Sequence, residues 1–170
     1  MNSDRRKPFV IGLTGPIGTG KSTVLSDLVS LGAEGIDADR VAHEVTAPGT
    51  AAYADIVAAF GREILAADGQ IDRRALGRRV FADAGLLARL EAIVHPAVAQ
   101  AIAERVAASH APAVVIEAIK LLEAELSRKL CDEVWVTRCS RRQQIARLRA
   151  SRGMSEAEVR RRLASQMPLK

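Results

Sequence analysis

Short apolar runs alternate with helical patterns at the start of the chain. Residues 9–14 are rich in β-forming side chains and are predicted to form a strand buried on both faces. A helix is predicted over 21–31 and stops at Gly32, and a second short strand is predicted over 34–37. The helix is expected to carry its apolar residues on one side, at Val24, Leu25, Leu28, Val29 and Leu31. A strand, a glycine loop, a helix and a strand in this order predict an α/β fold that opens on a parallel sheet.

The middle of the chain has a helical pattern from Val41 to Val106. Pro48-Gly49 and Asp68-Gly69 break this pattern, and His95-Pro96 limits how a helix can run through that point. The stretch is therefore predicted to be a helical insertion.

Later segments return to the sheet and then to helices. Strands are predicted over 113–117 and 133–137, followed by an arginine-rich helix over 140–152 that Gly153 ends. Ser155 and Glu158 form a capping box that begins another helix. The expected organisation is a core over 1–40 and 107–139, a helical lobe over 41–106 and a helical hairpin over 140–170.

One motif carries a specific chemical prediction. Residues 15–22 read GPIGTGKS and fit the phosphate-loop pattern G-x-x-x-x-G-K-S/T at every required position. Glycines let backbone N–H groups turn inward around a polyphosphate, and a helix N-terminus directs its dipole at the anion. Lys21 is expected to reach the β- and γ-phosphate oxygens, and the Ser22 hydroxyl to ligate Mg²⁺. The predicted nucleotide-binding residues are Gly15, Gly18, Thr19, Gly20, Lys21, Ser22 and Thr23.

Composition excludes several other classes of protein. The 170 residues are 48% hydrophobic and 26% charged, which is typical of a soluble globular protein. No apolar stretch was expected to approach the roughly 20 residues of a membrane-spanning helix, and the apolar start is too short for a secretory signal, so a cytoplasmic protein is predicted. Cys131 and Cys139 lie in no metal-binding pattern and are predicted to be reduced structural thiols.

Charge is concentrated at the end of the chain. The net charge is +5, yet residues 128–170 hold ten arginines and two lysines against four acidic residues. A basic end predicts an anionic partner. Aromatic residues are only 3% of the chain and no RNA-binding signature is present, so a small phosphorylated ligand is favoured, with no nucleic acid and no membrane as partners.

The remaining residues separate a kinase from a GTPase. A guanine reader of the form Asn-Lys-x-Asp is missing, because Asn2 is the only asparagine and no lysine is followed two residues later by aspartate. A kinase needs a carboxylate at the end of a neighbouring strand to deprotonate the acceptor hydroxyl. Asp37 and Asp39 stand there, and in extended chain their spacing would direct both side chains to one side. Asp39 is the predicted base; capping of a helix that begins near Val41 is the alternative.

Four segments together resemble the dephospho-CoA kinase family. They read IGLTGPIGTGKSTV at 11–24, GIDADRVAHEV at 35–45, LEAIVHPAV at 90–98 and QIARLRASRGMSEAEVRRRLASQMP at 144–168. The first is common to P-loop kinases, whereas the combination is more specific. The resemblance implies a P-loop kinase core with a parallel sheet, a helical acceptor-binding insertion and an arginine-rich helical lid. It implies transfer of the γ-phosphoryl group of ATP, with Mg²⁺, to the ribose 3′-hydroxyl of dephospho-CoA, the last step of coenzyme A synthesis.

The resemblance also implies roles for particular residues. Asp39 matches the catalytic base, and Arg147 and Arg152 match lid arginines that neutralise charge on the transferring phosphoryl group. Arg73 and Arg74, in the acceptor lobe, are candidates for the CoA phosphates, with surface salt bridges as an equal alternative. His95 is interpreted as a structural or acceptor-contact histidine rather than a base.

Two departures from the family pattern stand out. Family members have a Pro-Leu-Leu-hydrophobic-Glu segment after the third strand, whereas residues 117–123 read EAIKLLE, with Lys120 near the place of the proline. Glu117 remains a candidate for organising Mg²⁺ through water. Relatives also continue beyond the position of Lys170 into a strand, a loop near the adenine and a helix, so the chain is expected to be truncated at that end.

Two other functions remain open from sequence. One is a different small-molecule or nucleotide kinase. The other is a basic nucleic-acid-binding P-loop ATPase that uses the arginine-rich end.

Overall fold

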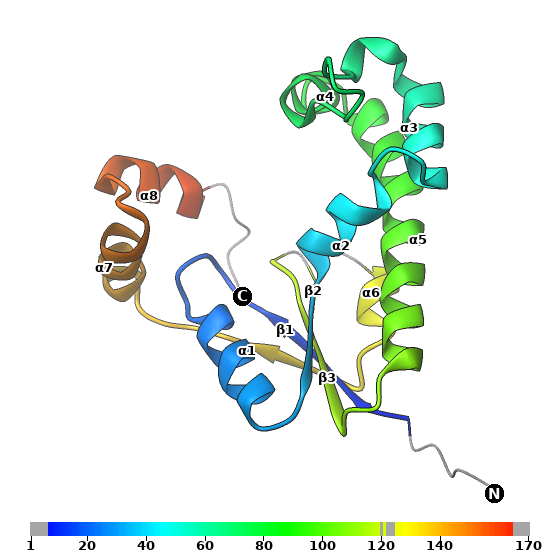
Figure 1. Ribbon diagram of the computed structural model, residues 1–170. Coiled ribbons are helices and arrows are strands. Elements are labelled where there is room, and N and C mark those ends of the chain that lie inside the picture. The colour runs from blue at the N-terminus through cyan, green and yellow to red at the C-terminus, as the bar shows by residue number, and fades with distance from the viewer. Residues whose placement is uncertain (1–6, 120, 122–124, 165–170) are drawn as a thin grey trace, which may run out of the picture. The chain divides into compact units, whose positions relative to one another are not determined.

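The computed structural model describes residues 7–119, 121 and 125–164, and the chain divides into two units (Figure 1). The first unit comprises the residues up to 36 together with those from 109 onward. The second unit is the continuous stretch Asp37–Ala108. Each unit has its own buried apolar residues.

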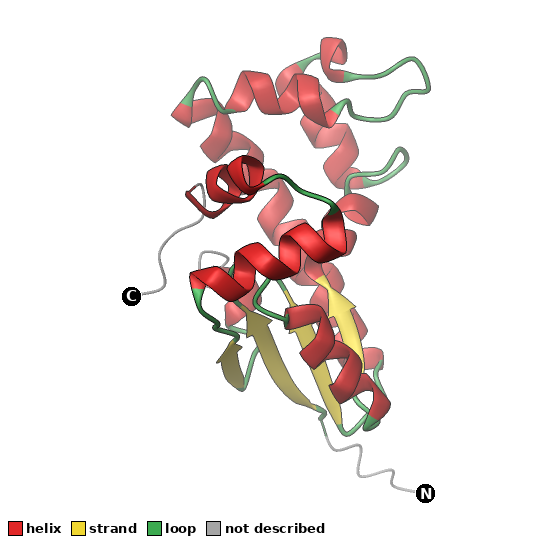
Figure 2. Ribbon diagram, turned by 90° about the vertical axis from the view of Figure 1, so that its left-hand side faces the viewer, coloured by secondary structure: helices red, strands yellow, loops and turns green. Residues whose placement is uncertain are grey.

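A four-stranded sheet forms the centre of the first unit. Its strands, drawn as yellow arrows in Figure 2, are β1 (Phe9–Thr14), β2 (Glu34–Asp37), β3 (Ala113–Glu117) and β4 (Glu133–Val136). Their spatial order is β2-β3-β1-β4. β1 pairs in parallel with β3, placing Leu13 beside Glu117, and in parallel with β4, placing Thr14 beside Val136. The predicted α/β class and parallel sheet are confirmed. β1 is buried along its length except at Phe9, as a central strand should be.

One face of the sheet is covered by α1 (Lys21–Ser30). Val24, Leu25 and Leu28 of this helix pack against the buried Ile11 and Leu13 of β1. The prediction that Val29 and Leu31 share this apolar face is wrong, because they are 45% and 81% exposed. Val29 points about 100° away from Leu28 around the helix axis, so it lies off the buried face. Leu31 follows Ser30, the last residue of the helix.

The remaining helices of the first unit are α6 (Glu125–Arg128), α7 (Arg141–Arg152) and α8 (Glu156–Ala164). Ser140 and Gln143 form a capping box at the start of α7, and Gly153 ends the helix in the left-handed conformation. Ser155 and Glu158 form the second capping box, through the Ser155 hydroxyl and the Glu158 carboxylate. The predicted helical hairpin is therefore present.

The second unit is helical apart from its connecting loops and one antiparallel bridge between Leu65 and Ile71. It contains α2 (Ala38–Val45), α3 (Ala51–Phe60), the 3₁₀ turn η1 (Arg62–Ile64), α4 (Arg73–Val80) and α5 (Ala84–Ala108). Its buried cluster comprises Ile56, Phe60, Ile64, Leu76 and Val80. The helices α2, α3 and α4 all pack against α5, the longest helix of the unit.

The helix α5 differs from two expectations. It runs as one helix of 25 residues through Pro96, although His95-Pro96 was expected to restrict it. Proline removes one helical hydrogen bond, but packing against three neighbouring helices offsets that loss. Its length and apolar composition also meet the requirement for crossing a membrane, so the expectation that no stretch approaches that requirement is wrong.

Candidate active site

The loop between β1 and α1 turns on three glycines with positive φ. These are Gly15 at 141°, Gly18 at 76° and Gly20 at 104°. Gly15 also needs the space that glycine leaves, because a Cβ there would lie 2.5 Å from the Thr137 carbonyl oxygen. The glycines of the motif therefore have both a conformational and a steric cause.

The N-terminus of α1 lacks the features that normally neutralise a helix start. Gly20 is the N-cap, no side chain caps the first turn, and that turn contains no acidic residue. In contrast, α2, α3, α4 and α7 are N-capped by Asp37, Thr50, Asp72 and Ser140, whose side chains accept hydrogen bonds from the first turn. The backbone N–H groups at the start of α1 are thus suited to an anionic ligand.

Lys21 lies across this loop. Its side chain is only 7% exposed, and Nζ donates to the Gly15 carbonyl oxygen at 2.8 Å. A buried ammonium group beside the helix N-terminus adds positive charge where the loop amides converge. Ser22 and Thr23 follow in the first turn of α1 and are exposed.

Residues distant in sequence also meet at the loop. Arg147 of α7 donates from Nη1 to the Thr19 carbonyl oxygen at 3.1 Å, so the predicted arginine and the phosphate loop are brought together. Two further residues, Thr137 and Gln144, contact the loop and were not assigned from sequence. The sequence did contain a signal for Gln144. It lies three residues before Arg147 and four before Leu148, so the three residues share one face of the helix that begins after the Ser140 capping box.

Glu117 and Arg152 are the other residues predicted for this region. Glu117 is the last residue of β3, at the carboxyl edge of the sheet and beside Leu13. Arg152 is the last residue of α7, and its side chain lies outside the described part of the structure. Lys120, the departure from the family pattern, also lies outside the described residues.

Asp37 and Asp39 belong to the second unit and have different roles. The Asp37 side chain caps α2 by accepting from the Arg40 backbone N–H at 3.1 Å. The expectation of extended chain through Asp39 is wrong, because α2 begins at Ala38 rather than near Val41. Asp39 therefore lies exposed in the first helical turn, and only the capping interpretation of Asp37 is confirmed.

The three acceptor candidates also lie in the second unit. Arg73 begins α4 and donates from Nη2 to the Thr46 hydroxyl at 3.1 Å, and partial burial lowers its pKa. Arg74 follows it and is exposed, and His95 is exposed in the middle of α5. This hydrogen bond links Arg73 to Thr46, the C-cap of α2, which is the helix that carries Asp39.

An ion-pair network joins α2 to α5. The Glu44 carboxylate accepts from Arg105 and pairs with Arg40 at 3.2 Å. The hydrogen bond from Arg105 is the main reason that the pKa of Glu44 is lowered. This network holds α2, which carries Asp39 in its first turn, against the long helix of the unit.

The cysteines are unpaired thiols, as the sequence predicted. Both are half-buried, and burial together with the Asp132 carboxylate raises the pKa of Cys131. Among the described residues no cluster of three or more histidine, cysteine or acidic side chains forms a metal site.

The fold and the glycine loop define the class of protein: a parallel α/β sheet with a phosphate loop between its first strand and helix is a P-loop nucleotide-binding fold. The model of the dephospho-CoA kinase family matches residues 9–170. The chain belongs to the dephospho-CoA kinase family and is a kinase.

Individual relatives agree with this assignment. The dephospho-CoA kinase of Geobacter metallireducens is 50% identical over 164 residues, which are 95% of this chain and 81% of the relative. That of Geobacter sulfurreducens is 48% identical, over 94% of this chain and 82% of the relative. The crystal structure of TT1252 from Thermus thermophilus matches with a TM-score of 0.80 and 34% identity, covering 96% of this chain and 82% of that one.

Proposed function

We propose that the protein transfers the γ-phosphoryl group of ATP to the ribose 3′-hydroxyl of dephospho-CoA and releases coenzyme A and ADP. The observation that carries this proposal is the uncapped start of α1 with the buried Lys21 beside it, in a chain of the dephospho-CoA kinase family. The bond that forms joins the ribose oxygen to the γ-phosphorus, and the bond that breaks joins that phosphorus to the β–γ bridging oxygen.

The phosphate loop would hold the triphosphate. The amides at the start of α1 and the Lys21 ammonium bind its β- and γ-oxygens, and Arg147 offsets charge on the transferring group. Arg152 is proposed to assist as the second lid arginine. Gly15, Gly18 and Gly20 allow the backbone approach that such binding needs.

The residues present fit a magnesium ion bound together with ATP. Ser22 supplies an exposed hydroxyl in the first turn of α1, and Glu117 ends the strand next to β1. Oxygen donors of this kind suit Mg²⁺, which keeps several waters and binds through few protein groups. When bound, the ion neutralises charge on the phosphate oxygens.

Asp39 is proposed as the base that takes the proton of the acceptor hydroxyl. The exposed position in the first turn of α2 leaves its carboxylate open to a substrate. Arg73 and Arg74 are proposed to contact the phosphates of dephospho-CoA, with His95 as a further acceptor contact. We also propose a cytoplasmic enzyme that needs neither nucleic acid nor a membrane.

The matched family favours dephospho-CoA over the other acceptors of small P-loop kinases. A nucleic-acid-stimulated ATPase would show ATP hydrolysis that rises with added nucleic acid and binding that weakens steeply with salt. We expect neither behaviour.

The test is a coupled assay for ADP release with dephospho-CoA, nucleoside monophosphates or shikimate as acceptor. Only dephospho-CoA should support turnover. Asp39→Asn should reduce kcat by about a hundredfold or more while the MgATP Kd stays near that of the native protein, because a general base acts only on the chemical step. Lys21→Ala should lower kcat and also weaken the binding of MgATP. Near-native turnover of Asp39→Asn would overturn the base assignment, and preference for another acceptor would overturn the substrate.

A further inference from the structure

The phosphate loop is held in shape by residues more than 110 positions further along the chain. Thr137 follows β4, and Gln144 lies in α7. Both make hydrogen bonds to loop residues within the first unit. We propose that Thr137 and Gln144 are positioning residues that hold the phosphate loop in its nucleotide-binding shape, an inference that rests on the proposed binding of ATP by this loop.

A chain of hydroxyl groups connects Thr137 to the interior of the loop. Thr19 Oγ1 lies 2.7 Å from the Pro16 carbonyl oxygen and 2.6 Å from Thr137 Oγ1. Either hydroxyl can donate in the contact between Thr19 and Thr137. Thr137 Oγ1 also lies 3.3 Å from the Thr14 carbonyl oxygen, to which it can donate, so the hydroxyl links Thr14 and Thr19. Thr137 thereby orients the Thr19 side chain, whose hydroxyl is hydrogen-bonded to the Pro16 carbonyl oxygen across the loop.

The backbone of Thr137 anchors the same region. Its N–H donates to the Thr14 carbonyl oxygen at 2.9 Å, at the residue just before the first loop glycine. Its carbonyl oxygen leaves no room for a Cβ at Gly15. Thr137 therefore contacts the loop at its start through the backbone and near its end through the side chain.

Gln144 provides a second, independent anchor. The side chain is only 8% exposed, and its Nε2 donates to the Ile17 carbonyl oxygen at 3.1 Å. One helical turn further, Leu148 packs with Ile17 and with Val159 of α8 in a small buried cluster. The Ile17 side chain of the loop thus packs against α7 and α8, and the side-chain amide of Gln144 holds the backbone of Ile17.

The anchors have a clear energetic purpose. A loop with three glycines has many accessible conformations, and fixing each residue costs conformational entropy. If the protein fixes the loop in advance, ATP binding does not have to supply that free energy. The effect is the same in the ground state and the transition state, so loss of an anchor should raise the KM for ATP while kcat changes little.

Thr137→Val tests the hydroxyl with almost no change in shape, and Thr137→Ser restores the hydroxyl. Loss of one hydrogen bond of ordinary strength predicts a rise of about fivefold to tenfold in the MgATP KM and Kd for Thr137→Val. Thr137→Ser should stay within about twofold of the native values. Gln144→Met keeps the length of the side chain, removes its donor to Ile17, and should give a rise of similar size.

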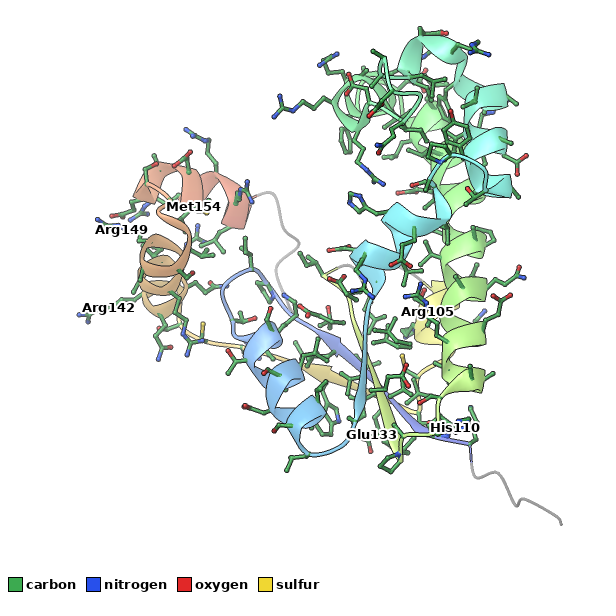
Figure 3. All side chains as sticks on the ribbon, viewed as in Figure 1. Arg105, His110, Glu133, Arg142, Arg149 and Met154 are labelled. Carbon is green, nitrogen blue, oxygen red and sulfur yellow. The ribbon has the colours of Figure 1, made fainter. Side chains whose placement is uncertain are left out.

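Arg142→Met is the matched control on the same helix. Arg142 is exposed, and Figure 3 shows it extending from α7 on the side away from the phosphate loop. Its substitution should leave the MgATP KM and Kd unchanged. Hydrogen exchange of the peptide over residues 14–21, measured without nucleotide, should be faster in Thr137→Val and Gln144→Met than in the control.

Several results would overturn the inference. One is a native MgATP Kd in both Thr137→Val and Gln144→Met, and another is a fall in kcat with an unchanged KM. If Thr137→Val fails to fold, Gln144→Met decides the question alone. If the native protein binds MgATP but does not turn over dephospho-CoA, the proposed acceptor fails, whereas the Kd values still test the anchors.

Discussion

Gly15→Ala is the most informative single substitution for the loop. At φ 141° the backbone of Gly15 is one that residues with a Cβ rarely adopt, and the added methyl group would lie 2.5 Å from the Thr137 carbonyl oxygen and 3.2 Å from its backbone nitrogen. Because these are backbone atoms, no side-chain rotation relieves the overlap. Either the loop or the segment after β4 must shift.

The magnitude follows from two contributions. Forcing a residue with a Cβ into the positive-φ region costs about 1–2 kcal/mol. Overpacking a tight site costs about 1–3 kcal/mol more. Gly32→Ala provides the matched control, because Gly32 has φ 100° in the same unit and nothing lies within 4 Å of a Cβ there. The control should therefore show only the first contribution.

Urea unfolding followed by circular dichroism measures both variants. We expect Gly15→Ala to lower the free energy of unfolding by about 2–5 kcal/mol and Gly32→Ala by about 1–2 kcal/mol. Gly15→Ala should also lose the thermal stabilisation that MgATP gives the native protein, whereas Gly32→Ala should keep it. Equal destabilisation of the two variants would refute the close approach of Thr137 to the loop.

Two further substitutions test contacts elsewhere in the chain. Leu148→Ala should lower the free energy of unfolding by about 2–4 kcal/mol in urea, because Leu148 is 2% exposed and packs between Ile17 and Val159; a loss under 1 kcal/mol would contradict that packing. Glu44→Gln tests the ion pairs that join α2 to α5. Since Arg105 lowers the folded pKa of Glu44, the stabilisation is present above the unfolded pKa and is lost as the pH falls through the lowered folded pKa. Between about pH 6 and pH 3 the urea midpoint of the native protein should therefore fall more steeply than that of Glu44→Gln, and parallel curves would exclude this contribution.

Local patterns predicted the elements of the first unit well. The bounds of β1, β2 and β3 match the expected ranges, and β1 and β3 are short apolar runs of the kind that predicts a buried strand. The capping box of Ser155 and Glu158 lies where the sequence indicated, because a capping box is a contact between residues three positions apart. Signals of this kind need no knowledge of the rest of the fold.

The errors have one local and two tertiary causes. The prediction of extended chain at Asp39 failed because Asp37 caps a helix directly after β2, and a single aspartate is compatible with either conformation. The helix α5 continues through Pro96 because neighbouring helices stabilise it. Thr137 shows no local signal, since its role arises only when β4 pairs with β1.

The sheet order has a consequence for how the protein is made. β1 leaves the ribosome before the other described strands, and its neighbours β3 and β4 follow about a hundred residues later. An apolar segment at the centre of the final sheet must therefore wait, unpaired, while the whole helical unit is synthesised. Helices can form from local contacts during this interval, so the nascent chain should acquire helical structure before it acquires the ability to bind nucleotide.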